Sequence, residues 1–284
     1  MKEKLSLEEI KRRFEKVKLI VSDIDGTIIN NQGEVGAETK AILKDLKSKN
    51  INLTLATQRI HSSVVPIAKD LNISAPLITL NGSYIADING NVINKFLIKP
   101  KKVELALKLA EKYFCKIALC TNDMIVYTED NSVLKDFMGR IGTNYELINS
   151  YKNYMNNTIE IIMMGNDKHT IKKIQNKLSF PFKLHLSAKY FRSQSHRGVY
   201  NLEARRSKIS KKTGVEQVTK ILKLKRDEVA VFGDWYNDRE LFKFGGINIA
   251  LQNAVGELKA DADYVTEFSN DEDGLGRFLK LIYT

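Results

Sequence analysis

Two aspartates that closely follow a short apolar run constrain the fold of this chain more than any other feature. The run is Leu19-Ile20-Val21, and the acids are Asp23 and Asp25. A short apolar run is typical of a strand buried on both faces of a parallel sheet. Ligands bind outside the carboxyl ends of such strands, and two neighbouring carboxylates repel each other unless a cation lies between them. The alternative is a simple turn, which Asp and Gly26 also favour.

Strands and helices alternate after this stretch. Helices are predicted at 37–49 and 61–71, with strands at 52–56 and 77–80. The pattern is βαβαβ, which predicts a parallel sheet with right-handed crossovers. Small polar residues follow the second and third strands, as Thr57-Gln58-Arg59 and Asn81-Gly82. We therefore expect a shared site where the three strands end.

The pattern changes between residues 84 and 198. A hairpin at 84–96 turns at Asn89-Gly90, a strong turn signal, and helices then mix with short strands, among them 182–186 and 190–194. After Asn201 the parallel pattern resumes, with a strand at 228–232 and a final helix from about 275. The prediction is an α/β fold with a Rossmann-like, doubly wound core made of 1–83 and 199–284, including an N-terminal helix at 6–17. Residues 84–198 are predicted to form an inserted α+β cap domain.

Charge and cysteine content bound the class of protein. The net charge of +11 suits nucleic acid, an acidic membrane surface or small anionic substrates. The basic residues are interspersed with acids, which favours solvated helix faces, so neither nucleic acid nor a membrane is an expected partner. The charged N-terminus lacks the apolar core of a signal peptide. Cys115 and Cys120 are expected to be reduced core residues of a cytoplasmic protein.

The predicted strand ends collect groups suited to a metal ion and a phosphate. Asp23, Asp25 and Asp234 supply carboxylates, Thr57 supplies a hydroxyl, and Lys211 stands at the start of a helix. Mg²⁺ prefers hard oxygen ligands, whereas phosphate binds lysine, hydroxyl and amide donors.

With these motifs in order, the chain resembles the haloacid dehalogenase-like phosphatases, specifically the Cof-type subfamily with a large α/β cap. The resemblance rests on Asp23-Ile24-Asp25-Gly26-Thr27, Thr57, Lys211, Gly233-Asp234-Trp235-Tyr236-Asn237-Asp238, Asn253-Ala254 and Asp271-Glu272-Asp273-Gly274. Lys208 and Lys212 are rival lysines, but the spacing to Asp234 favours Lys211. Gln58 and Lys212 stand where the family usually has glycine, and Ala204-Arg205-Arg206 replaces an apolar-Pro pattern. These departures leave the substrate preference open.

The resemblance implies a Mg²⁺-dependent phosphatase that acts through an aspartyl phosphate. Asp23 would attack phosphorus, and Asp25 would protonate the leaving oxygen and then take a proton from the attacking water. The Asp23 carboxylate, the Asp25 backbone carbonyl and the Asp234 carboxylate would hold Mg²⁺.

The remaining residues are expected to bind or orient. Thr57 and Lys211 would bind the transferring phosphoryl group, and Asn237 would donate to phosphate. Asp238 would orient Lys211 or a water on the metal, or else be a helix N-terminal acid favoured by the dipole. Three further residues are expected to contact substrate or phosphate: Arg59, Asn81 and Gly82.

The expected substrate is a small phosphomonoester. Sugar phosphates come first, followed by pyridoxal phosphate and flavin mononucleotide, and His185, Tyr190 and Arg192 of the inserted segment are candidates for choosing among them. A sugar phosphomutase is one alternative, although no second phosphate-binding cluster is evident. The other is a catalytically silent, basic nucleic-acid-binding protein, against which the intact set of acids and lysine argues. The oligomeric state is expected to be monomer or homodimer.

Overall fold

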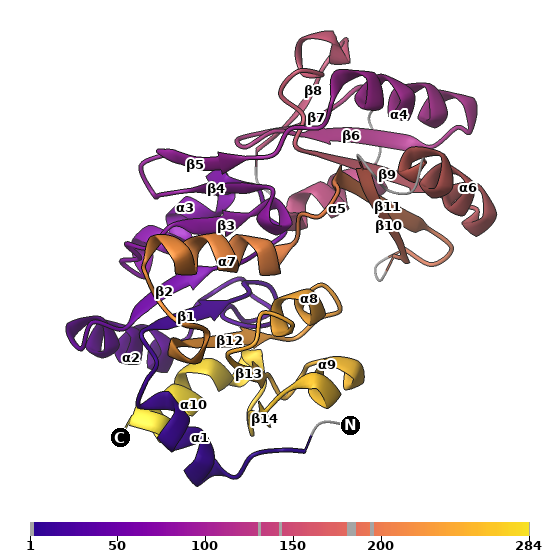
Figure 1. Ribbon diagram of the computed structural model, residues 1–284. Helices are drawn as coiled ribbons and strands as arrows, with labels where there is room; N and C mark the ends of the chain where they lie inside the picture. Colours follow the sequence, from indigo (N-terminus) through magenta and orange to yellow (C-terminus); the bar gives the residue numbers. More distant parts are fainter. Residues whose placement is uncertain (1–2, 130–131, 142–143, 181–185, 194–195, 284) are drawn as a thin grey trace.

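A five-stranded parallel sheet forms the centre of the lower part of the molecule in Figure 1. The computed structural model describes residues 3–129, 132–141, 144–180, 186–193 and 196–283. The strand order is β14-β13-β12-β1-β2, so β1 lies between β12 and β2. The strands are β1 (Leu19–Ser22), β2 (Asn52–Leu55), β12 (Val229–Gly233), β13 (Ile247–Ala250) and β14 (Tyr264–Val265). Every residue of β1 is buried, as the apolar run predicts.

Helices cover both faces of this sheet. Successive side chains of a strand point to opposite faces. Ile20 packs in the apolar cluster that includes residues of α1, α2, α3 and α10, whereas Leu19 and Val21 pack in the cluster that includes α7, α8 and α9. The helices are α1 (Leu7–Phe14), α2 (Ala37–Ser48), α3 (His61–Asp70), α7 (Lys211–Ile221), α8 (Asp238–Phe242), α9 (Gly256–Asp261) and α10 (Gly274–Tyr283). This arrangement confirms the doubly wound α/β core.

The N-terminal helix belongs to the same body. Ser6 and Glu9 form a reciprocal capping box at the start of α1, which satisfies backbone donors that the helix leaves free. Phe14 is buried and meets Phe278 of α10 edge to face, with ring centroids 5.7 Å apart. Helix α1 therefore closes one face of the sheet.

A six-stranded sheet forms the upper right of Figure 1, in the order β10-β11-β9-β6-β7-β8. Its strands are β6 (Lys116–Cys120), β7 (Ile125–Tyr127), β8 (Tyr145–Leu147), β9 (Glu160–Gly165), β10 (Leu186–Arg192) and β11 (Tyr200–Arg206). Helices α4 (Pro100–Lys112) and α6 (Lys168–Ser179) share an apolar cluster with Leu119 and Ile161, and α5 (Ser132–Ile141) shares another with Ala118 and Ile162. The two clusters lie on opposite faces of the sheet, because residues 118 and 119, like 161 and 162, point in opposite directions.

The predicted third parallel strand belongs to a different sheet. Strand β3 (Leu77–Thr79) pairs antiparallel with β4 (Tyr84–Ala86), which pairs with β5 (Val92–Lys95). An isolated parallel bridge, Ala56 to Ile78, connects β3 to the large sheet. The 3-10 turn η1 (Leu80–Gly82) reverses the chain through positive φ values at all three residues, so β4 returns along β3. The hairpin predicted at 84–96 is confirmed.

The sheets divide the chain at other places than the predicted boundaries. The boundary at 83/84 separates β3 from β4, although the two strands are paired. The boundary at 198/199 assigns β11 to the core, whereas β11 pairs with β9 and β10 in the six-stranded sheet. We propose instead a core of 3–98 and 207–283 and an inserted cap of 99–206.

One continuous strand, β10, replaces part of the two short strands predicted at 182–186 and 190–194. Residues 181–185 and 194–195 lie outside the described part of the chain. The remaining short 3-10 turns are η2 (Tyr151–Asn153), η3 (Arg226–Glu228) and η4 (Asn270–Glu272). Both cysteines are buried and free, as expected. Within the described ranges, no helix has the length and apolar character needed to cross a membrane.

Candidate active site

Three strand ends meet at one edge of the parallel sheet. Asp23 follows β1, Asp234 follows β12, and Thr57 comes two residues after β2. Because β12 and β2 flank β1 in parallel register, their ends bring these side chains together. All three residues line a cleft of about 1490 Å³ that is also lined by residues of β10 and β11. The site predicted at the strand ends therefore lies between the parallel sheet and the six-stranded sheet.

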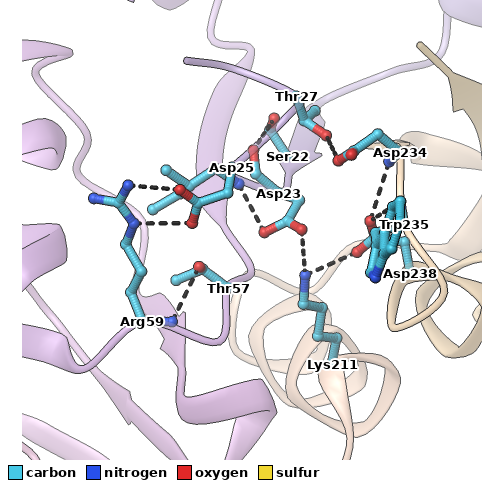
Figure 2. Close-up of polar contacts among 11 residues, drawn as sticks. Ser22, Asp23, Asp25, Thr27, Thr57, Arg59, Lys211, Asp234, Trp235 and Asp238 are labelled. Atoms are coloured by element: carbon cyan, nitrogen blue, oxygen red, sulfur yellow. Dashed lines mark hydrogen bonds and ion pairs between the residues drawn. The ribbon is translucent and has the colours of Figure 1, made fainter. Parts of the chain in front are cut away.

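Lys211 connects two of the acids. Its Nζ atom lies 2.7 Å from Oδ2 of Asp23 and 2.8 Å from Oδ1 of Asp238, and its side chain is 1% exposed (Figure 2). Ser210 caps α7 and thereby sets Lys211 at the first helical position. The spacing argument that favoured Lys211 agrees with this placement.

The rival lysines lie elsewhere in the cleft wall. Lys212 faces Glu216 one turn along α7, at 3.7 Å. Lys208 is exposed and lies in the turn before the helix. Neither has a recorded contact with Asp23.

Asp238 holds both the lysine and the turn that carries Asp234. Its Oδ2 atom accepts hydrogen bonds from the backbone N–H groups of Asp234 and Trp235, each at 3.1 Å (Figure 2). Asp238 is also the first residue of α8. The contact with Lys211 and the helix N-terminal position, which were alternatives in the sequence, thus occur together in one residue.

The buried acids carry more negative charge than the single lysine offsets. Burial raises the pKa of Asp23 well above its usual range, and Asp238 raises it further, while Lys211 opposes both. Burial, with Asp238, also raises the pKa of Asp234 to about 7. For Lys211, burial lowers the pKa, but Asp23 and Asp238 outweigh it, so the ammonium stays charged.

This charge imbalance suits a divalent cation. Carboxylate oxygens of Asp23, Asp234 and Asp238 lie within 4.8 Å of one another and are all buried. Hard oxygen donors of this kind are those that Mg²⁺ and similar ions prefer. The residues present therefore fit a divalent metal ion.

The loop after β1 places the Asp234 carboxylate. Thr27 donates a hydrogen bond from Oγ1 to Oδ1 of Asp234 at 2.7 Å. Gly26 has φ +75°, and a Cβ atom there would lie 2.3 Å from Oδ2 of Asp234. Only glycine allows this close approach of backbone and carboxylate.

Asp25, which lines the cleft, pairs with Arg59, which is not among the residues that line it. The guanidinium of Arg59 donates to both carboxylate oxygens of Asp25, at 2.9 Å and 2.6 Å (Figure 2). The Asp25 side chain is 53% exposed, whereas Asp23 is buried. The two aspartates of the first motif therefore differ in environment, with one inside the site and one at its edge.

The other predicted site residues occupy different positions. Asn81 and Asn237 line the cleft, and the Oδ1 atom of each is buried and has no hydrogen-bond partner in the described part of the chain. Gly82 packs against the start of α7 instead, where a Cβ atom would lie 2.2 Å from the Ser210 carbonyl oxygen. Its φ of +90° and this contact give it a packing role beside Lys211.

Residues of the motifs at 253–254 and 271–274, and the adjacent Asn270, acquire structural roles. Asn253 donates to the Gly26 carbonyl oxygen at 2.8 Å, and Asn270 donates to the Ile29 carbonyl oxygen at 2.9 Å. Both side chains thus hold the loop after β1. Asp273 accepts hydrogen bonds from the backbone N–H groups of Glu38 and Thr39, so it caps α2 from another part of the chain. The motif matches marked Asn253 and Asp273 but not Asn270, and the partners of all three are remote in sequence.

Sequence reasoning missed a polar group on the opposite wall. Glu203 and Arg205 of β11 line the cleft, and Gln58 donates a hydrogen bond to Glu203. The departures at 58 and 204–206 from the family pattern were the available signal. Of the candidates for substrate choice, Tyr190 and Arg192 line the cleft, and His185 lies outside the described residues.

Comparisons with known proteins identify the family and the fold. A family model described as haloacid dehalogenase-like hydrolase matches residues 20–279. The Bacillus subtilis 5-amino-6-(5-phospho-D-ribitylamino)uracil phosphatase YcsE is 24% identical, over 95% of this chain and 98% of its own length. Phosphatase YwpJ of the same organism is 26% identical, over 93% and 99%. A crystal structure of a haloacid dehalogenase-like hydrolase from Bacteroides thetaiotaomicron superimposes with a TM-score of 0.81 at 25% identity, covering 94% of this chain and all of that one.

Proposed function

The chain belongs to the haloacid dehalogenase-like hydrolase family and is a phosphoric monoester hydrolase, and we propose that it uses Mg²⁺ to release phosphate from small phosphorylated metabolites. The observation that carries the proposal is the buried contact of Lys211 with Asp23 and Asp238, beside Asp234. A nucleophilic carboxylate, a phosphate-binding cation and a metal-binding acid then lie within one site.

Asp23 is the nucleophile in this proposal. One of its carboxylate oxygens attacks phosphorus, the bond from phosphorus to the leaving oxygen breaks, and an aspartyl phosphate forms. Asp25 donates a proton to the leaving oxygen and then takes one from the water that hydrolyses the aspartyl phosphate. Arg59 donates to both oxygens of Asp25 and so holds this carboxylate in place. If Arg59 binds the substrate instead, the Asp25 carboxylate is freed for proton transfer.

Asp23, Asp234 and the backbone carbonyl of Asp25 would hold Mg²⁺. The ion supplies positive charge that offsets the repulsion between the phosphate and the carboxylates. Lys211 and Thr57 bind the phosphoryl oxygens, and Asn237 donates to them from the cleft wall. Asp238 keeps Lys211 oriented through its 2.8 Å contact.

We further propose that the inserted cap excludes water from the site and selects the substrate. Residues of β10 and β11 line the same cleft as Asp23, which supports this role. Sugar phosphates remain the leading class, with pyridoxal phosphate and flavin mononucleotide next. The relative YcsE is named for a substrate whose phosphate is carried on a ribityl chain, which supports a polyhydroxylated leaving group.

The experiment is phosphate release from a panel of small phosphomonoesters, with Mg²⁺ and with a chelator. We expect release that the chelator abolishes and added Mg²⁺ restores. Asp23→Asn should lower the rate by about three orders of magnitude or more, because the covalent route is lost. Asp70→Asn is the matched control, since Asp70 is exposed and pairs with Lys40 on the surface. Full turnover by Asp23→Asn would refute the mechanism, and isomerised rather than released phosphate would indicate a mutase.

A further inference from the structure

Strand β11 presents three polar side chains to the cleft. Alternate residues of a strand share a face, and Asn201, Glu203 and Arg205 all line the cleft. Leu202 and Ala204 point the other way into the apolar cluster beneath α4 and α6. We refer to Asn201, Glu203 and Arg205 as the β11 strip. Its members are 2%, 7% and 8% exposed, so polar groups are buried where the cap faces the core.

The β11 strip is held in place by charged and polar partners. Arg205 stands opposite Glu160 in the neighbouring strand β9, and its Nη1 atom lies 3.0 Å from Oε1 of Glu160. The same Nη1 atom is 3.9 Å from Oε2 of Glu203. Glu203 also accepts the hydrogen bond from Gln58, the residue after Thr57. The strip is therefore fixed directly beside the loop that carries a proposed phosphate ligand.

Two buried amide oxygens at this place, like Oε2 of the neighbouring Glu160, have no hydrogen-bond partner among the described residues. The Oδ1 atoms of Asn201 and Asn81 are buried and make no hydrogen bond to any described residue. They belong to opposite walls of the cleft, because Asn201 is on β11 and Asn81 follows β3. Buried polar atoms without partners are uncommon in folded proteins, and each calls for a reason. A ligand with hydrogen-bond donors, bound between the walls, would satisfy both.

The donors and acceptors of the strip fit hydroxyl groups. A hydroxyl both donates and accepts, so it can donate to Asn201 or Glu203 and accept from Arg205. A second phosphate would be repelled by the Glu203 carboxylate. A leaving group that placed the edge of an apolar ring here would leave the Oδ1 atoms of Asn81 and Asn201 without hydrogen bonds. Such a leaving group is therefore disfavoured.

Building on the phosphatase function proposed above, we propose that the β11 strip, together with Asn81, is the subsite that binds the hydroxyl groups of the leaving group. The substrate class is then a phosphorylated sugar or sugar alcohol, and Asn201 and Glu203 determine that specificity. Glu160 holds Arg205 and also hydrogen-bonds the side chain of Asn81, so it is a positioning residue.

The test compares substrates that differ in hydroxyl groups. The kcat/KM values of sorbitol 6-phosphate, glucose 6-phosphate and ribose 5-phosphate are measured against those of n-hexyl phosphate and pyridoxal 5′-phosphate. We expect the kcat/KM of the best sugar compound to be at least ten times that of n-hexyl phosphate and of pyridoxal 5′-phosphate. This quotient is the selectivity ratio. Glu203→Gln and Asn201→Ala should each lower this ratio by about tenfold, since each removes a hydrogen bond to the hydroxyls. Asn201→Ala leaves the hydrogen bond of Arg205 with Glu160 intact, so it remains informative if Glu203→Gln fails to fold.

Glu216→Gln is the control. This substitution makes the same chemical change as Glu203→Gln, but on the α7 wall of the cleft and away from the strip. The selectivity ratio should stay at the wild-type value. Phosphate release without preference for the sugar compounds, or an equal loss for all compounds in Glu203→Gln, would overturn the subsite and leave the phosphatase function standing. Release from no compound by the wild type would overturn both.

Discussion

The Nζ atom of Lys211 lies 2.7 Å from Oδ2 of Asp23, and this contact joins the first residue of α7 to the end of β1. Both side chains are buried, and Asp238 shares the same lysine. Removing one member of a buried ion pair leaves the others as uncompensated charges, which costs far more than loss of a pair at the surface. The proposed catalytic lysine is therefore also a structural link.

Replacing Lys211 by methionine should damage both activity and stability. We expect phosphate release to fall about 100-fold or more, as for loss of a preorganised oxyanion donor. The free energy of unfolding should fall by about 3–5 kcal/mol, because Asp23 and Asp238 lose their cation. Steady-state kinetics and urea unfolding measure the two effects.

Lys212→Met is the matched control for that change. The lysine is adjacent in sequence, and its contact with Glu216 at 3.7 Å is partly exposed. We expect at most about 1 kcal/mol of destabilisation, as is usual for surface pairs. Equal losses in the two variants would show that Lys211 has no special place in the site.

Gly26→Ala should weaken the site through the Asp234 carboxylate. The new Cβ atom would lie 2.3 Å from Oδ2 of Asp234, so the carboxylate or the loop must shift. We expect a large loss of phosphate release and a higher Mg²⁺ requirement. Gly33→Ala separates this effect from backbone strain, because Gly33 also has positive φ but nothing lies within 4 Å of its Cβ position. Both variants should lose about 1 kcal/mol of stability from the left-handed conformation, and only Gly26→Ala should lose activity.

Metal binding should depend on pH near neutrality. Burial, with Asp238, raises the pKa of Asp234 to about 7, and a proton there competes with the metal ion. The Mg²⁺ concentration that gives half-maximal activity should rise about tenfold per pH unit below pH 7 and level off above it. A Mg²⁺ titration between pH 5.5 and 8 measures this. The increase in Tm on adding Mg²⁺ should likewise be larger at pH 8 than at pH 6, and a pH-independent increase would contradict the assignment of Asp234.

Stability should fall as pH rises because of Glu160. Burial raises the pKa of Glu160 to about 8, helped by Glu203 and opposed by Arg205. The folded chain then keeps a proton that the unfolded chain loses near pH 4.5. The stabilisation is complete below that pH and disappears as pH rises to 8, with a slope of up to about 1.4 kcal/mol per pH unit. Urea unfolding at several pH values should show a shallower decline for Glu160→Gln than for wild type.

Glu104→Gln supplies the comparison for that slope. Glu104 is on the surface, and its hydrogen bond with Lys108 lowers its pKa below the ordinary value of 4.5. It is therefore ionised over the pH range from about 5 to 8 in which Glu160 is expected to lose its proton. Its slope should match wild type. If the free energy of unfolding falls with pH equally steeply in wild type and Glu160→Gln, Glu160 is ionised throughout this pH range and the prediction is wrong.

Much of the core and its acids could be predicted from local patterns. The buried run 19–21, the alternation of strands and helices and the capping box at Ser6 are local signals, and the structure contains the corresponding elements. The acids at 23 and 234 follow their strands directly, so a parallel sheet brings them together in any register that aligns the strand ends. These features depend on residues close in sequence.

Partners that are distant in sequence could not be predicted in this way. Strand β3 has the expected apolar residues but pairs with β4, because the chain reverses at Leu80–Gly82. The predicted domain boundary assigns residues 200–206 to the core, but they form strand β11, which pairs with β9 and sets Arg205 opposite Glu160. Which of several strands pair, and in which register, depends on the free energy of the whole packed structure.

The sequence by itself determined the parallel core, the acids at its strand ends and the lysine between them. Only the tertiary structure decided which side chains face those groups from the other wall of the cleft. Local periodicity encodes burial and strand direction, whereas the meeting of Gln58 with Glu203 requires two separate sheets to be packed against each other. Such contacts arise from the folding of the whole chain, and the specificity of the site depends on them.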